Sequence, residues 1–70
     1  MKKLDNKTRE QIRALAISFE AFYDYRMKRD YLAAARWGDR VLRLQEELGT
    51  PMLMPSTVRL MHRLAGKKAA

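Results

Sequence analysis

The sequence predicts an all-α protein in which an antiparallel two-helix hairpin is followed by a short third helix. Three observations lead to this prediction. The chain is rich in Ala, Leu, Arg, Lys, Glu and Met, which are strong helix formers. Its apolar residues recur at helical spacing, without the period-two alternation that is typical of strands. Asp, Gly and Pro residues divide the chain at places where helices would begin and end.

The first helix is expected over residues 6–29. Asp5 or Asn6 can cap it, because a short polar side chain there accepts a hydrogen bond from a free backbone N–H group. Its apolar residues form a main stripe and a thinner line outside it, so one buried face does not account for all of them. The main stripe consists of Ile12, Leu15, Ala16, Phe19, Phe22, Tyr23 and Met27, and the thinner line of Ala14, Ala21 and Tyr25.

The second helix is expected over residues 31–48, with Asp30 as its N-cap and Gly49 as its stop. Its apolar residues repeat as a heptad, and the turn before it is short, so the two helices must fold back on each other. The heptad consists of Ala34, Val41 and Leu48 at one position and Trp37 and Leu44 at the other. The residues expected in the core are Ile12, Leu15, Phe19, Phe22, Val41 and Leu44.

A short third helix is expected over residues 56–65, stopped by Gly66 and followed by a frayed basic tail at 66–70. Its apolar side chains can pack back on the hairpin, so that residues 1–70 form a single domain. These side chains are Leu60, Met61 and Leu64.

The length of the chain favours self-association. A chain of 70 residues buries only about 60% of the surface that its unfolded form exposes. Each hairpin helix also carries more apolar surface than one narrow partner helix can cover. A two-helix unit cannot bury two faces alone, so the sequence predicts a homodimer formed through the surplus apolar surface.

The composition argues against an enzyme. The chain has no cysteine and a single histidine, so it cannot build a zinc cluster. His62 has no acid after Glu47 in the sequence to orient it, and the adjacent Glu46 and Glu47 diverge by about 100° on a helix. We therefore expect no catalytic residue, no metal ligand and no cofactor.

The distribution of apolar residues predicts a cytoplasmic protein. No run approaches the roughly 18 apolar residues of a membrane span. The segment Leu4-Asp5-Asn6-Lys7 stands where a signal peptide would require an apolar stretch of about 7–15 residues. We expect neither a leader nor a contact with a membrane.

The net charge is +7, and part of it forms a ridge on the second helix. Arg36, Arg40 and Arg43 occupy positions i, i+4 and i+7, opposite the heptad seam. Such a ridge can hold phosphates, bind an acidic protein surface or only keep a small chain soluble. The ridge alone leaves these three interpretations open.

All six aromatic residues lie within residues 19–37, on both sides of the turn. Two short helices cannot bury all of them, and Tyr, Trp, Met and Arg are enriched at protein interfaces. One or two aromatics at the turn, Tyr25 or Tyr31, are therefore expected to be exposed. The candidate partner-binding residues are Tyr25, Arg26, Arg29, Tyr31, Arg36, Arg40 and Arg43.

A DNA-binding helix-turn-helix is the alternative to this hairpin. Ala34, Gly38 and Leu44 match the family's spacing of a small residue, a glycine and an apolar residue. However, Asp39 stands where an apolar residue should follow the glycine, and Glu47 stands where the second helix should be buried. We prefer one uninterrupted helix, in which Gly38 permits the close approach of another backbone.

The stretch Tyr25-x4-Asp30-Tyr31-x2-Ala34 is similar to a single tetratricopeptide repeat. Phe22 and Glu46 depart from that pattern, which has a small residue and a closing proline at their positions. One repeat cannot form the groove with which a repeat array holds a peptide, so this resemblance implies the hairpin geometry alone.

A very small, cysteine-free, basic helical hairpin without catalytic groups resembles the small early proteins with which bacteriophages inhibit host regulators. It is similar in these features to the anti-activators that block a quorum-sensing transcription factor. The resemblance implies a non-enzymatic inhibitor in the host cytoplasm. Its partner would be a host transcription regulator or a pilus-assembly ATPase.

The charge pattern ranks a protein partner above nucleic acid. Asp39, Glu46 and Glu47 are interleaved with the arginines of the second helix. Carboxylates repel a phosphate backbone, whereas a protein interface uses both signs to fix its register. The last twenty residues carry positive charges only, so a small basic DNA-binding regulator is the second choice.

Overall fold

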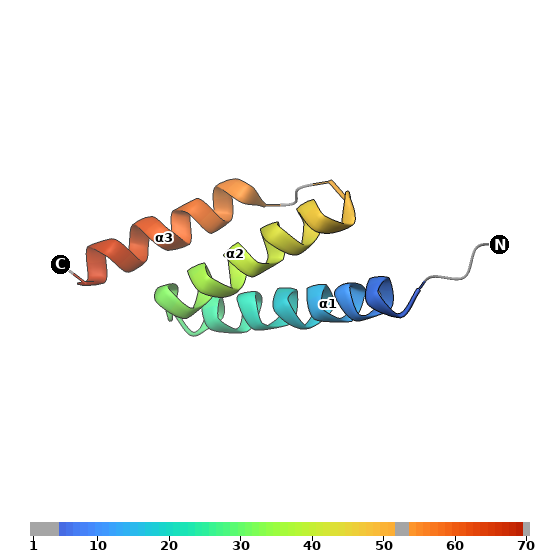
Figure 1. The fold of residues 1–70 in the computed structure, drawn as a ribbon. Coiled ribbons are helices and arrows are strands. Elements are labelled where there is room, and N and C mark those ends of the chain that lie inside the picture. The colour runs from blue at the N-terminus through green and yellow to red at the C-terminus, as the bar shows by residue number, and fades with distance from the viewer. Residues whose placement is uncertain (1–4, 52–53, 70) are drawn as a thin grey trace.

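The computed structural model describes residues 5–51 and 54–69, and it confirms the all-α class and the antiparallel hairpin. The described residues form three helices, α1 (Asn6–Met27), α2 (Tyr31–Leu48) and α3 (Pro55–Ala69). α2 lies between the other two and packs against both, and it runs antiparallel to each (Figure 1). The molecule is elongated, with extents of 50 × 18 × 14 Å. None of the described helices is long and apolar enough to cross a membrane.

The helix ends follow the capping chemistry of the sequence. The Asp5 carboxylate accepts a hydrogen bond of 2.7 Å from the backbone N–H of Thr8. Hydrogen bonding from the side chain and then the backbone of Thr8 holds the pKa of Asp5 below its usual value. Asp30 caps α2 by accepting from the N–H of Ala33 at 3.3 Å. Gly49 ends α2 in the left-handed conformation at φ 69°, where glycine has no Cβ to clash. The expected start of α1 and both ends of α2 are therefore confirmed.

α1 ends at Met27, two residues earlier than expected. Arg29 has a φ of 60°, and its N–H donates to the carbonyl of Arg26 at 3.1 Å. The N–H of Asp30 then donates to the carbonyl of Tyr25 at 2.9 Å. This left-handed residue closes the turn and directs the chain into α2.

α3 is longer than expected, because it continues through Gly66 to Ala69. Glycine inside a helix costs only about 1 kcal/mol relative to alanine. The helix-forming residues on both sides of Gly66 offset that cost, so the helix continues. The expectation that Gly66 stops the helix and begins a frayed tail is therefore wrong for residues 66–69.

The core forms where all three helices meet. It is centred on Phe22, whose side chain is 1% exposed and packs with residues of α2 and α3. Val41 and Leu44 are buried as expected, whereas Leu15 and Phe19 are only half-buried. The other buried residues are Ser18, Ala34, Ala35, Gly38, Gln45, Val58 and Met61.

Ile12 is 44% exposed, so its expected place in the core is wrong. α1 turns the line of Ala14, Ser18 and Ala21 toward α2 instead, because small side chains allow the two helices to approach closely. The hydroxyl of Ser18 donates to the carbonyl of Ala14 at 2.6 Å, which satisfies this polar group in the core.

Gly38 lies at the closest approach in the core. A Cβ atom at this position would lie 2.8 Å from Val58 Cγ2 and 3.1 Å from Phe22 Cε1. The expected close contact is therefore present, but it is made by side chains of α1 and α3 rather than by a backbone. Of the α3 residues expected to pack on the hairpin, Met61 is buried and Leu64 half-buried, while Leu60 is 42% exposed.

Candidate partner-binding surface

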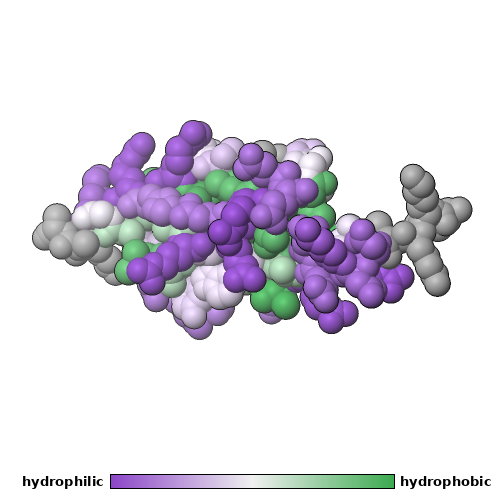
Figure 2. All heavy atoms as spheres, in the orientation of Figure 1, coloured by the Kyte–Doolittle hydropathy of each residue, from purple (hydrophilic) through white to green (hydrophobic). Residues whose placement is uncertain are grey.

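The outer face of α2 presents the arginine ridge. Arg36, Arg40 and Arg43 are all exposed, as the heptad implies. The guanidinium of Arg40 lies 5.7 Å from the centre of the Trp37 ring, within range of a cation–π interaction. Hydrophilic residues cover much of the face seen in Figure 2, with hydrophobic residues visible between them.

The carboxylates of α2 share this outer face with the ridge. Asp39, Glu46 and Glu47 are exposed. Glu47 accepts a hydrogen bond of 3.4 Å from the side-chain amide of Gln11 on α1. The surface therefore alternates in sign, as the sequence implies.

His62 has an orienting acid that the sequence analysis missed. Its Nε2 atom lies 2.8 Å from both carboxylate oxygens of Asp39, which joins α3 to α2. Both side chains are about half exposed, so this pair is a solvated contact rather than a buried proton-transfer site. The acid comes from 23 residues earlier in the chain, and only the packing of α3 against α2 reveals it.

The turn presents cations, but its tyrosines are less exposed than expected. Arg26 and Arg29 are exposed. Tyr25 and Tyr31 are half-buried and pack against the core, so neither stands free at the end of the hairpin. The ammonium group of Lys28 lies 5.8 Å from the centre of the Tyr25 ring.

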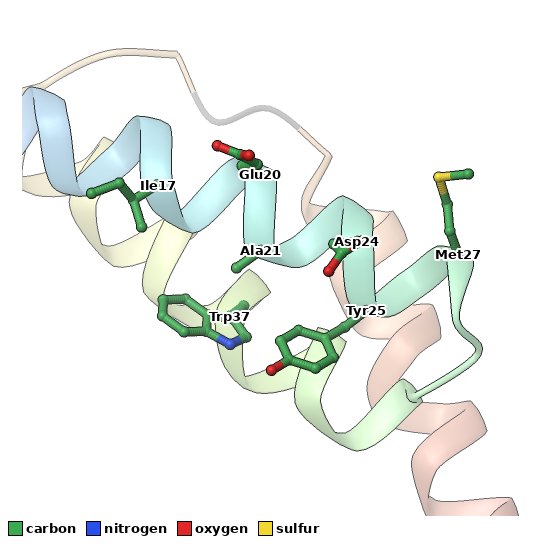
Figure 3. Close-up of a pocket in the computed structure, with 7 residues that line it drawn as sticks. All are labelled: Ile17, Glu20, Ala21, Asp24, Tyr25, Met27 and Trp37. Carbon is green, nitrogen blue, oxygen red and sulfur yellow. The ribbon is translucent and has the colours of Figure 1, made fainter.

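A groove runs along the border between α1 and α2, beside the ridge, and the sequence analysis did not find it. The ring of Trp37, from α2, and the ring of Tyr25, from α1, both line it, together with the small side chain of Ala21 from α1 (Figure 3). Ile17 is 54% exposed at one end. We call this feature the α1–α2 groove, and its lining residues are Ile17, Glu20, Ala21, Asp24, Tyr25, Met27 and Trp37.

The α1 edge of the groove is acidic. Glu20 and Asp24 lie one turn apart on α1 and are exposed. Lys28 donates a hydrogen bond of 3.0 Å to Asp24, and this contact raises the pKa of the Lys28 ammonium group. The α2 edge carries Arg40, so the two sides of the groove have opposite charge.

Searches of protein-family models, curated proteins and solved structures find no match to this chain. Among the described residues, no group of three His, Cys, Asp or Glu side chains could hold a metal ion.

Proposed function

We propose that this chain is a small non-enzymatic regulatory protein that binds a protein partner and inhibits it stoichiometrically. The observation that carries the proposal is the outer face of α2, where exposed arginines alternate with exposed carboxylates beside an aromatic groove. Two-signed surfaces fix the register of a protein interface, and aromatic side chains supply its desolvated anchor. A host transcription activator or a pilus-assembly ATPase, in the cytoplasm, is the partner class that the phage resemblance suggests.

Nucleic acid is the second candidate, and one observation favours it. Arg59, Arg63 and Lys67 are exposed on α3, which carries no carboxylate. These cations could contact phosphates without the repulsion that Asp39 and Glu46 would cause on α2. Two measurements separate the candidates: capture from a bacterial lysate before and after nuclease treatment, and the salt dependence of binding. A partner lost on nuclease treatment would support the nucleic-acid function.

Charge reversal on the ridge tests the protein-binding function. We expect Arg36→Glu or Arg40→Glu to weaken binding of the captured partner about tenfold, because each replaces an attraction at the interface with a repulsion. Arg63→Glu on α3 makes the same change in net charge and serves as the matched control. Calorimetric titration measures the affinities, and circular dichroism confirms that each variant folds. Equal effects at Arg36 and Arg63 would contradict a specific ridge interface.

We also propose that the protein is a homodimer, formed through the apolar stripe of α1 that the core leaves uncovered. Ile12 and Tyr23 are each 44% exposed on this stripe, so a second copy of the chain could bury apolar surface there. The uncovered stripe consists of Ile12, Ala16, Phe19 and Tyr23, in which the Phe19 and Tyr23 rings stack with their centres 6.5 Å apart.

A single charge in this stripe should separate the dimer. We expect Ile12→Glu to give a monomer in sedimentation at micromolar concentration with its helical signal intact, because it buries a carboxylate in the proposed interface. Ile17→Glu is the matched control, since Ile17 is 54% exposed and belongs to the α1–α2 groove instead. A monomeric mass for the unmodified chain would refute the dimer.

A further inference from the structure

One cation of the chain, Lys28, already contacts two residues that line the α1–α2 groove. The Lys28 ammonium group lies 3.0 Å from a carboxylate oxygen of Asp24 and 5.8 Å from the centre of the Tyr25 ring. A carboxylate and an aromatic face together form a site that favours a positive charge. Lys28 and Asp24 are more than half exposed, so solvent screens their attraction and a better cation can displace Lys28.

The groove has more binding capacity for a cation than Lys28 uses. Glu20 makes no ion pair within the described part of the chain, and it lies one turn before Asp24 on the same edge. Ala21 is small, so it leaves room for an aliphatic stem between α1 and the Trp37 ring (Figure 3). The groove therefore combines an acidic edge on α1 with an apolar floor and aromatic walls, while Arg40 lies over the Trp37 ring at the opposite edge.

We propose that the α1–α2 groove binds an arginine side chain of a protein partner. The guanidinium group takes the place of Lys28 against Asp24 and interacts with Glu20, while the methylene stem lies on Ala21 and the Trp37 ring. Arginine fits this site better than lysine, because its planar guanidinium binds a carboxylate through two hydrogen bonds and stacks on aromatic rings.

This inference deepens the proposed function and rests on it in one respect, namely that the partner is a protein. The partner would present acidic groups to the ridge and an arginine to the groove, which would fix its orientation across α1 and α2. The affinity of the groove for an arginine side chain can be measured with a short peptide, without the partner.

The probe is a blocked pentapeptide with one arginine between alanines, titrated into the full chain. Trp37 is the only tryptophan of the sequence, so its fluorescence reports on the groove. We expect a dissociation constant of about 1 mM for so short a ligand. The citrulline peptide, which has nearly the same shape without the charge, should bind at least fivefold more weakly, and the lysine peptide should lie between them.

Three variants of the chain test the geometry. Asp24→Asn should weaken binding of the arginine peptide at least fivefold, because it removes the carboxylate that holds the guanidinium. Lys28→Met should strengthen binding about threefold, because it removes the competing cation. Glu10→Gln also removes one negative charge from an exposed position on α1, but outside the groove, and should change the affinity by less than twofold.

Equal binding of the citrulline peptide, equal effects of Asp24→Asn and Glu10→Gln, or weaker binding by Lys28→Met would each overturn the arginine site. If the peptide fails to bind while a nuclease-resistant protein partner is still captured, the groove inference fails and the proposed function stands. If the peptide binds but no protein partner is captured, the proposed function fails instead.

Discussion

Replacing Phe22 with alanine is expected to remove a large part of the stability of the protein. The side chain of Phe22 is 1% exposed and packs with α2 and α3 at the meeting point of the helices. Truncating a buried phenylalanine costs about 3–5 kcal/mol, because the contacts are lost and a cavity is left. A chain of 70 residues has a total stability of only about 4–10 kcal/mol, so this loss is a large part of it.

Phe19→Ala is the matched control for this prediction. It removes the same atoms from the same helix, but Phe19 is half-buried on the stripe that the core leaves uncovered. Its effect on the free energy of unfolding should be clearly smaller. Urea denaturation followed by circular dichroism measures both values, at one fixed concentration because association would also stabilise the fold. If Phe19→Ala is the more destabilising of the two, the core is centred elsewhere.

The helices were predictable where the signal is local. α2 begins and ends where expected, because Asp30 and Gly49 satisfy backbone groups within a few residues of themselves. The face that α1 buries was not predictable from hydrophobicity, which favours Ile12 over Ser18. Close packing instead selects small residues along the seam, and the Ser18 hydroxyl finds its acceptor within its own helix.

The candidate partner-binding surface also has a part that the sequence predicts and a part that depends on packing. The exposure of Arg36, Arg40 and Arg43 follows from one helix and its heptad, so the sequence predicts it. The α1–α2 groove and the contact between His62 and Asp39 depend on how two helices pack, and no spacing along the chain indicates them. The one available signal was the thinner apolar line on α1, because it includes the small residue Ala21, which forms the floor of the groove.

Enlarging Gly38 is expected to disrupt the packing of all three helices. Even a single Cβ would lie 2.8 Å from Val58 Cγ2 and 3.1 Å from Phe22 Cε1. Helix propensity favours alanine over glycine by about 1 kcal/mol, whereas overpacking a core costs about 1–3 kcal/mol. Gly38→Ala should therefore be destabilising by up to about 2 kcal/mol, and Gly38→Leu by about 3 kcal/mol or more, because leucine adds three further carbons to a closed space.

Gly66 supplies the control, because it lies inside α3 and a Cβ there would have no neighbour within 4 Å. Gly66→Ala should raise the stability by about 0.5–1 kcal/mol, through helix propensity alone. Thermal and urea unfolding measure the stability of both alanine variants. Gly38→Ala should be less stable than the unmodified chain, and Gly66→Ala should be more stable. The double variant Gly38→Ala with Val58→Ala should lose less stability than the sum of the two single changes, because Val58→Ala removes the methyl groups that the new Cβ would meet. Additive losses would show that the contact between Gly38 and Val58 does not limit the approach of α3 to α2.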